Sequence, residues 1–122
     1  MSSTRRHIDG GSVWETRVGY SRAVRAGDFV FVSGTTADGA DAYEQTKAAI
    51  ARIEVALVEA VASLDDVVRT RIFTTNIADW AQIGKAHREA FADIRPAATM
   101  VEVARLIAPE MLVEIEVDAY LR

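Results

Sequence analysis

Two amphipathic segments, each flanked by short strand-like runs, constrain the fold of this 122-residue chain more than any other feature. The first is expected to begin after Asp41 and to run to about Ala62, and the second to begin at Asp79 and to end before Pro96. In both, apolar residues recur with the 3.6-residue period of a helix that has one buried face. Both also open with capping-box spacing, an acidic residue followed three positions later by Glu or Gln. We therefore expect two helices that pack on one common surface.

Runs of β-branched and aromatic residues predict the strands that supply this surface. Residues 12–24 are extended in character, and residues 18–33 are expected to form a hairpin that turns at Gly27. Further strands are expected over residues 67–75, 99–104 and 112–121. The predicted order is β-β-α-β-α-β-β, which gives an α+β domain of two layers, a mixed β-sheet with two helices packed on one face.

One strand of the hairpin leaves a problem for a single subunit. Phe29 and Phe31 alternate with Val30 and Val32, so both faces of this strand are apolar. Two helices cover only one face of a sheet, and the other face must be polar or find a partner. We therefore expect the chain to oligomerise through the uncovered face.

Composition limits the function classes. Half of the residues are hydrophobic and 26% are charged, which is typical of one globular domain over residues 1–122, with residues 1–11 expected to be a flexible N-terminal segment. No apolar run approaches the length of a membrane span, and no signal peptide is recognisable, so a cytoplasmic location without a membrane partner is expected. The absence of cysteine excludes disulfides and thiolate catalysis. A net charge of −4 and scattered arginines argue against a nucleic-acid partner.

The last predicted strand carries the strongest chemical signal. Glu114, Glu116 and Asp118 alternate with apolar residues, so the three carboxylates share one face of the sheet. One of them could sit in a cleft and transfer protons, because nearby like charges raise a carboxyl pKa. The alternative is a solvated strand face, balanced by Arg69 and Arg71 on another strand. Spacing alone leaves both interpretations open.

Other chemistry-bearing residues give weaker signals. His87 lies on the apolar stripe of the second helix, where a hydrogen-bonded core histidine is more common than a ligand. No two histidines have the spacing of a metal site. Tyr20 either packs with its hydroxyl hydrogen-bonded or contacts a ligand.

Several short motifs, in this order and spacing, are similar to those of one family. They are Gly19-Tyr20, Val32-Ser33-Gly34, Gln45-Thr46, Pro96-Ala97, the run from Val101 to Leu106, and Glu114-Ile115-Glu116. On these residues the chain resembles the Rid family, the YjgF-type reactive intermediate deaminases. The resemblance implies a chorismate-mutase-like fold and a homotrimer with a small-molecule cleft at each subunit boundary. It also implies hydrolysis of imines and enamines such as 2-aminoacrylate, without a metal or organic cofactor.

The same resemblance implies the site residues. Glu114 takes the place of the family's catalytic glutamate, which assists the attacking water. The expected substrate-binding positions in the cleft are Tyr20, Ser33, Gly34, Ala98 and Met100.

Residue 98 is where this chain departs from the active deaminases. They carry an arginine there that binds the substrate carboxylate, whereas this chain has Ala98 and so resembles an arginine-lacking branch. Arg105 belongs to a different element, the Val103–Leu106 motif, and is not that arginine. Loss of a charge-assisted clamp of this kind costs about 2–5 kcal/mol of binding free energy.

Two functions follow. The first is hydrolysis of an imine, an enamine or a related labile nitrogen compound other than 2-aminoacrylate, with any carboxylate held elsewhere, for example by Arg17, Arg22 or Arg71. The second is a non-catalytic trimer that binds a metabolite or a protein in its clefts. A ribonuclease activity, with which some relatives are labelled, is disfavoured by the net negative charge.

Overall fold

A computed structural model describes residues 5–122 of the chain and shows one mixed sheet of six strands. Across the sheet the order is β1-β2-β3-β6-β4-β5, and every pairing is antiparallel except that of β4 with β5. The strands are β1 (Arg5–Ile8), β2 (Ala23–Ala26), β3 (Phe29–Thr35), β4 (Val67–Thr74), β5 (Ala97–Glu102) and β6 (Val113–Tyr120). β6, the last strand of the chain, is therefore central in the sheet.

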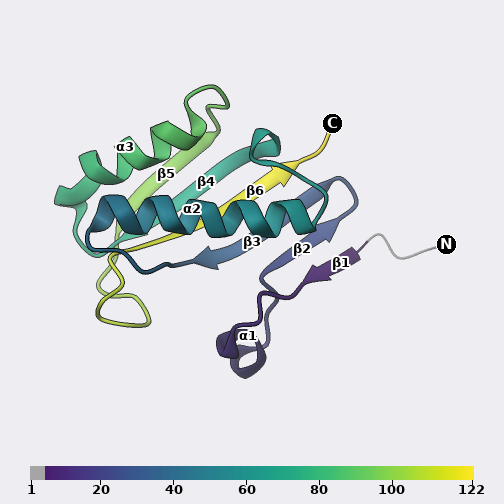
Figure 1. Cartoon of the computed structure of the whole chain (residues 1–122), viewed down its shortest axis with the longest axis horizontal. Coiled ribbons are helices and arrows are strands. Elements are labelled where there is room, and N and C mark those ends of the chain that lie inside the picture. The colour runs from purple at the N-terminus through teal and green to yellow at the C-terminus, as the bar shows by residue number, and fades with distance from the viewer. Residues whose placement is uncertain (1–4) are drawn as a thin grey trace.

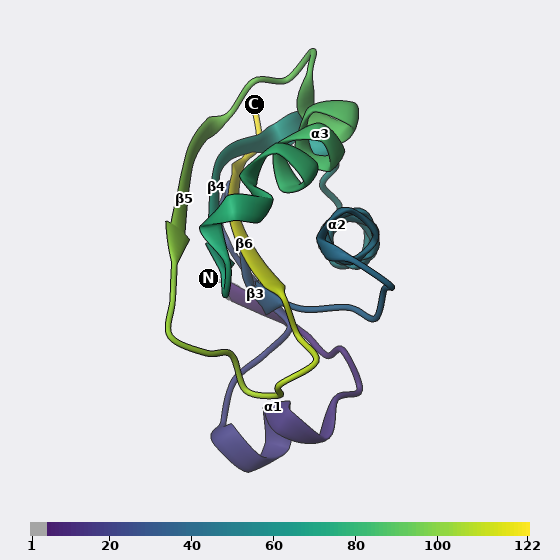
Figure 2. The same ribbon diagram turned by 90° about the vertical axis from the view of Figure 1, so that its left-hand side faces the viewer.

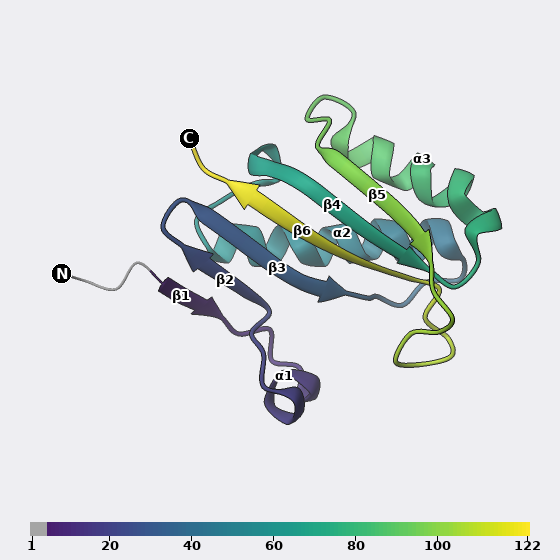
Figure 3. The same ribbon diagram turned by 180° about the vertical axis from the view of Figure 1, so that it is seen from behind.

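Two long helices, α2 (Ala42–Glu59) and α3 (Trp80–Phe91), lie on the same face of this sheet (Figures 1 and 2). The opposite face carries no helix (Figure 3). The core between the two layers is aliphatic, and its largest fully buried side chains include Ile53, Leu57, Ile83 and Ile115. The predicted two-layer α+β architecture is confirmed.

The helix ends follow local signals in part. At the start of α2 the Asp41 carboxylate accepts a hydrogen bond from the Glu44 N–H at 2.8 Å, as its spacing predicts. Asp79 makes no such cap at α3, because a short 3-10 turn (Ile77–Asp79), capped by Asn76, leads directly into that helix. The chain leaves α3 before Pro96, as expected from the missing N–H of proline.

Alternation along β6 separates its two faces as predicted. Val113, Ile115, Val117 and Ala119 are fully buried beneath the helices, so the acidic residues between them lie on the helix-free face. On the neighbouring β3, Phe29 and Phe31 remain 47% and 46% exposed on the helix-free face. The phenyl ring of Phe29 also contacts the ring of Tyr120, with 5.0 Å between the centroids. One face of the sheet thus keeps an aromatic surface that no helix covers.

The segment before the hairpin differs from the prediction. Residues 13–18 form a short helix, α1 (Val13–Val18), so the expected extended conformation over residues 12–24 is wrong. The Ser12 side chain and the Glu15 carboxylate complete a reciprocal capping box, which satisfies N–H groups that an extended chain would leave free. Gly19 ends the helix at φ 90°, a left-handed conformation suited to glycine. The hairpin therefore begins at Ala23 rather than at residue 18.

The N-terminal segment is partly placed. Residues 5–8 pair with β2 as strand β1, at the edge of the sheet. The expected flexibility of residues 1–11 stays a prediction, and residues 1–4 lie outside the described part of the chain. Within residues 5–122, no helix has the length and apolar character needed to span a membrane.

Candidate active-site cavity

A cavity of about 830 Å³ lies at the end of the sheet where β3 ends and β6 begins. Residues of helix α1 and of the loop between β5 and β6 line its sides. Four of the six predicted site residues line it, namely Tyr20, Ser33, Gly34 and Glu114. The fold thus brings together, within one chain, residues that are up to 94 positions apart in the sequence.

Glu114 lies against a backbone that only glycine permits. The pairing of β3 with β6 shifts register between Val32 and Thr35, and this irregularity includes Gly34. A Cβ added at Gly34 would overlap a carboxylate oxygen of Glu114 and lie 3.0 Å from its Cδ. The absence of a side chain at Gly34 is therefore what allows the carboxylate to occupy this part of the cavity.

The environment of Glu114 alters its acidity. The side chain is half-buried, and desolvation by this burial raises the pKa of the Glu114 carboxyl above its usual value. The positive charge of Arg22 acts in the opposite direction, and the neighbouring Glu116 adds a smaller upward effect on the same pKa. A raised pKa suits a carboxylate that must both accept and return a proton near neutral pH.

Arg22 lies next to this carboxylate and is itself 93% buried, with only 7% of its surface exposed. Its Nη2 donates to the carbonyl oxygen of Gly34 at 2.6 Å, and its guanidinium carbon lies 5.9 Å from the centre of the Tyr20 ring. Burial lowers the pKa of Arg22, and the nearby Arg52 lowers it further, while Tyr20, Glu15 and Glu114 raise it. Its Nε is buried without a hydrogen-bond partner. The cavity therefore contains a buried guanidinium beside a half-buried carboxylate.

The remaining predicted residues on the cavity wall have local supports. Tyr20 follows α1, and its N–H donates to the Glu15 carbonyl oxygen at 3.0 Å. The Ser33 hydroxyl donates to the Ser21 carbonyl oxygen at 2.7 Å, so its proton is already engaged and only its oxygen lone pairs are free. Tyr20 is thus held by the backbone of α1, and Ser33 by the backbone of the segment between α1 and β2.

Ala98 and Met100 do not line this cavity. Both lie on the edge strand β5, in register with Thr70 and Ile72 of β4, so β4 separates them from β6. Met100 packs against the core, whereas Ala98 is exposed. Within one chain, the position of the family's arginine is therefore remote from Glu114.

Arginines that sequence reasoning did not assign to the site do line the cavity. Arg52 comes from α2, and Arg105 comes from the loop between β5 and β6. Arg52 stands on the polar side of α2 in the sequence pattern, where nothing indicates that its long side chain returns toward the sheet. Arg105 follows β5 in sequence but lies near the start of β6 in space, which the motif order alone does not reveal.

The other candidates are engaged elsewhere. Arg71 pairs with Asp118 at 3.2 Å and lies 4.0 Å from Glu116, which confirms the expected balance of charges for Arg71, whereas no ion pair of Arg69 is found within residues 5–122. The guanidinium of Arg17 lies over the Trp14 ring at 5.5 Å. His87 shares a hydrogen bond of 2.9 Å with the Thr70 hydroxyl, and burial lowers its pKa, as expected of a core histidine. Across residues 5–122, no three His, Asp or Glu side chains converge as a metal site would require.

Comparison with known proteins agrees with this fold. Residues 12–121 match the family model described as Endoribonuclease L-PSP. An uncharacterised protein of Streptomyces coelicolor is 39% identical over 94% of this chain and 91% of its own length. The 3-aminoacrylate deaminase RutC of Acinetobacter baylyi is 34% identical over 79% of this chain and 82% of its own length.

Among solved structures, Rv2704 of Mycobacterium tuberculosis superimposes with a TM-score of 0.95 at 55% identity, covering 96% of this chain and 99% of that one. Rv2704 is described as a member of the YjgF/YER057c/UK114 family. The two layers of this chain, one mixed sheet and the helices on one of its faces, form the chorismate-mutase-like α+β fold of that family. The chain therefore belongs to the Endoribonuclease L-PSP family, which is also known as the YjgF, RutC or Rid family.

Proposed function

We propose that this protein hydrolyses an imine, an enamine or a related labile nitrogen compound to the carbonyl compound and ammonia, without a cofactor. The observation that carries the proposal is the half-buried Glu114 carboxylate, whose pKa is raised, in a cavity beside Arg22. The relative from Acinetobacter baylyi, which is named as a 3-aminoacrylate deaminase, supports the same class of reaction.

Hydrolysis of an imine requires mainly one group that accepts and donates protons. The Glu114 carboxylate would take a proton from water as the water oxygen bonds to the imine carbon. The Glu114 carboxyl returns its proton to the nitrogen, which gives a carbinolamine. Glu114 then takes the hydroxyl proton and passes it to the amino group as the carbon–nitrogen bond breaks, so that the carbonyl forms and ammonia leaves. An enamine enters the same sequence after protonation of its carbon gives the imine. A general acid/base in this position typically contributes about 10²–10⁴-fold to turnover.

Assembly is part of the proposal. The exposed aromatic surface of Phe29, Phe31 and Tyr120 on the helix-free face supports burial against other copies, for which we propose a homotrimer. Ala98 and Met100 lie at the β5 edge of the sheet, so only a second subunit could bring them near a cavity. The substrate would then bind in a cleft to which two subunits contribute.

Substrate choice follows from residue 98. Ala98 offers no cation to a carboxylate in the place that the family's arginine occupies, so 2-aminoacrylate is not the expected substrate. We do not propose RNA cleavage, because the net charge of −4 opposes binding to a polyanion. The cytoplasmic location stays a prediction.

The proposal is tested with imines generated in place by an amino acid oxidase acting on a series of amino acids. The released imine is trapped with semicarbazide, and an active hydrolase removes it before it is trapped. We expect reduced trapping for at least one imine, and little acceleration when a dehydratase supplies 2-aminoacrylate. The hydrolase proposal would be wrong if no imine of the series were hydrolysed faster than in buffer. Binding of the same compounds or their products would then favour the alternative, a non-catalytic binding protein.

A further inference from the structure

We propose that Arg22 and Arg52 together form an anion-binding site that receives the acid group of the substrate, in place of the arginine missing at residue 98. This inference rests on the proposed hydrolase function only in calling the anion a substrate. Three observations support the site: the way in which the two guanidinium groups are held, the lack of a direct ion pair to either of them within residues 5–122, and their distance in the fold from Ala98.

Arg22 is held in place along its whole length. A Cβ added at Gly10 would lie 3.0 Å from both Cβ and Cδ of Arg22, so the bare glycine leaves just enough room for the aliphatic stem. At the other end, the hydrogen bond from Nη2 to the Gly34 carbonyl oxygen fixes the guanidinium plane. A planar group that is fixed before binding loses little conformational entropy when it pairs with a carboxylate. The side chain is thus preorganised.

Arg52 approaches the same place from the other layer. Its Nη1 donates to the Thr36 carbonyl oxygen, just beyond the end of β3. Both Arg22 and Arg52 line the large cavity that contains Glu114, and both also line a smaller cavity of about 170 Å³ beneath α2. The two positive charges are close enough for Arg52 to lower the pKa of Arg22. Two cations that converge in this way repel each other unless an anion lies between them.

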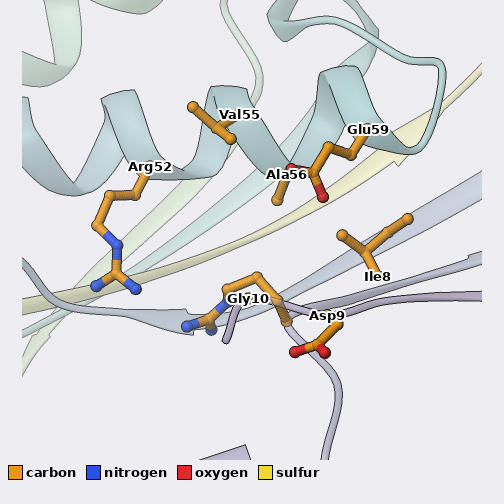
Figure 4. Close-up of a pocket in the computed structure, with 8 residues that line it drawn as sticks. Ile8, Asp9, Gly10, Arg52, Val55, Ala56 and Glu59 are labelled. Carbon is orange, nitrogen blue, oxygen red and sulfur yellow. The ribbon is translucent and has the colours of Figure 1, made fainter. Parts of the chain in front are cut away.

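Within residues 5–122, no carboxylate forms an ion pair with either arginine, although Glu15 and Glu114 lie near enough to raise the pKa of Arg22. Neither guanidinium has a carboxylate oxygen of residues 5–122 within 4.0 Å. The buried Glu15 carboxylate is occupied by the N–H groups of Gly10 and Ser12. Figure 4 shows Arg52 at one end of the smaller cavity, with the carboxylates of Asp9 and Glu59 toward the other end. The positive charge of the pair is therefore left for a ligand.

The location of this site determines which substrates fit. Arg22 is bonded to Gly34, and Gly34 lies against the Glu114 carboxylate, so the anion would bind within the same cavity as the reacting carbon. Arg105 also lines this cavity and adds positive charge from the loop between β5 and β6. The expected ligand is therefore a carboxylate-bearing imine other than 2-aminoacrylate, whose acid group binds Arg22 and Arg52 rather than a cation at the β5 edge.

The test is a binding measurement on the full-length protein in its native assembly, with pyruvate as an anionic probe and pyruvamide as its uncharged counterpart. Calorimetry should detect pyruvate binding that weakens with added salt, and much weaker binding of pyruvamide. Arg52→Gln should raise the Kd for pyruvate about tenfold or more, because a charge-assisted contact is lost. Arg88→Gln, which removes an exposed helix arginine outside both cavities, serves as the matched control and should leave the Kd unchanged.

Three results would overturn the anion site: no pyruvate binding at millimolar concentration, equal binding of pyruvamide, or equal effects of the Arg52 and Arg88 substitutions. Arg22→Lys offers a second probe that keeps the buried charge but not the planar fork, and it should also weaken pyruvate binding. This binding test measures no turnover. The anion site can therefore be confirmed even if the protein hydrolyses no imine, and it can be refuted even if the protein is a hydrolase.

Discussion

The two ends of the helix-free face of β6 have the same residue chemistry and different surroundings. At one end, Glu114 is half-buried against Gly34, with the guanidinium of Arg22 nearby and the pKa of its carboxyl raised by burial. At the other end, Asp118 forms an ion pair with Arg71 at 3.2 Å. One carboxylate lies in a cavity without a bonded cation, and the other is neutralised on the open sheet.

Alternation along a strand thus determines on which face a side chain lies, but not which role it has. What separates the two ends is the irregular pairing of β3 beside Glu114, together with the arrival of α1 and the β5–β6 loop. Near Asp118 the pairing with β3 is regular, and Phe31 is its direct cross-strand neighbour, whereas the pairing with β4 shifts register between Val67 and Arg69. Under the proposed function, the cavity end of β6 would carry the chemistry and the aromatic end would carry the assembly.

Loss of the assembly is the largest effect that we predict. Phe31→Lys places a charge on the aromatic surface while offering Asp118 a cross-strand partner, so the subunit should fold but no longer associate. Light scattering should show a mass near that of the 13.3 kDa chain, against three times that mass for the unmodified protein. Trp80→Lys is the control, because Trp80 is 62% exposed on α3 in the other layer. A Phe31→Lys protein that kept its full mass would place the subunit interface elsewhere.

A smaller but more local effect is expected at Gly34. Gly34→Ala should displace the Glu114 carboxylate and lower turnover about 100-fold, since displacement of a reacting group by about 1 Å is enough for such a loss. The global fold should survive, because the group that must move is mainly the end of a flexible side chain. Gly84→Ala in α3 meets no atom within 4 Å and should instead stabilise the protein by about 0.5–1 kcal/mol. Normal turnover in Gly34→Ala would remove Glu114 from the mechanism.

The smallest predicted effect is the contribution of Glu114 to the pH dependence of stability. The folded chain holds a proton on Glu114 more tightly than the unfolded chain does, because the pKa is raised from its ordinary 4.5. Stability from this group is therefore complete below pH 4.5 and is lost as the pH rises through the raised folded value. Glu114→Gln removes that loss of stability. The difference in Tm between the variant and the unmodified protein should therefore shift in favour of the variant as the pH increases. Parallel Tm curves for the two proteins would show that Glu114 is not desolvated.

Much of the fold could be predicted from the sequence because burial imposes a period. The spacing of apolar residues located α2 and α3, and strict alternation located β6 and its acidic face. α1 was missed although Ser12 and Glu15 have capping-box spacing, because its few residues carry no apolar stripe to confirm a helix.

Only those residues of the candidate site that lie in short family motifs could be predicted from the sequence. Tyr20, Ser33, Gly34 and Glu114 came from the family resemblance and do line one cavity. The approach of Arg52 to Arg22 could not be predicted, because it depends on how α2 lies over the end of β3 and on the direction of a long side chain. Such convergence is a property of packing, not of sequence period.

Turnover by Glu114→Gln is the most direct test of the claim that the cavity is a proton-transfer site. With an imine that the unmodified protein hydrolyses, the substitution should lower kcat by about 10²–10⁴-fold while the assembly and the binding of pyruvate persist. Glu116→Gln alters the same sheet face and removes only a minor influence on the Glu114 pKa, so its kcat should change by no more than a few fold. Equal losses in the two variants, or full activity in Glu114→Gln, would contradict the account and leave Glu114 as part of an acidic strand face.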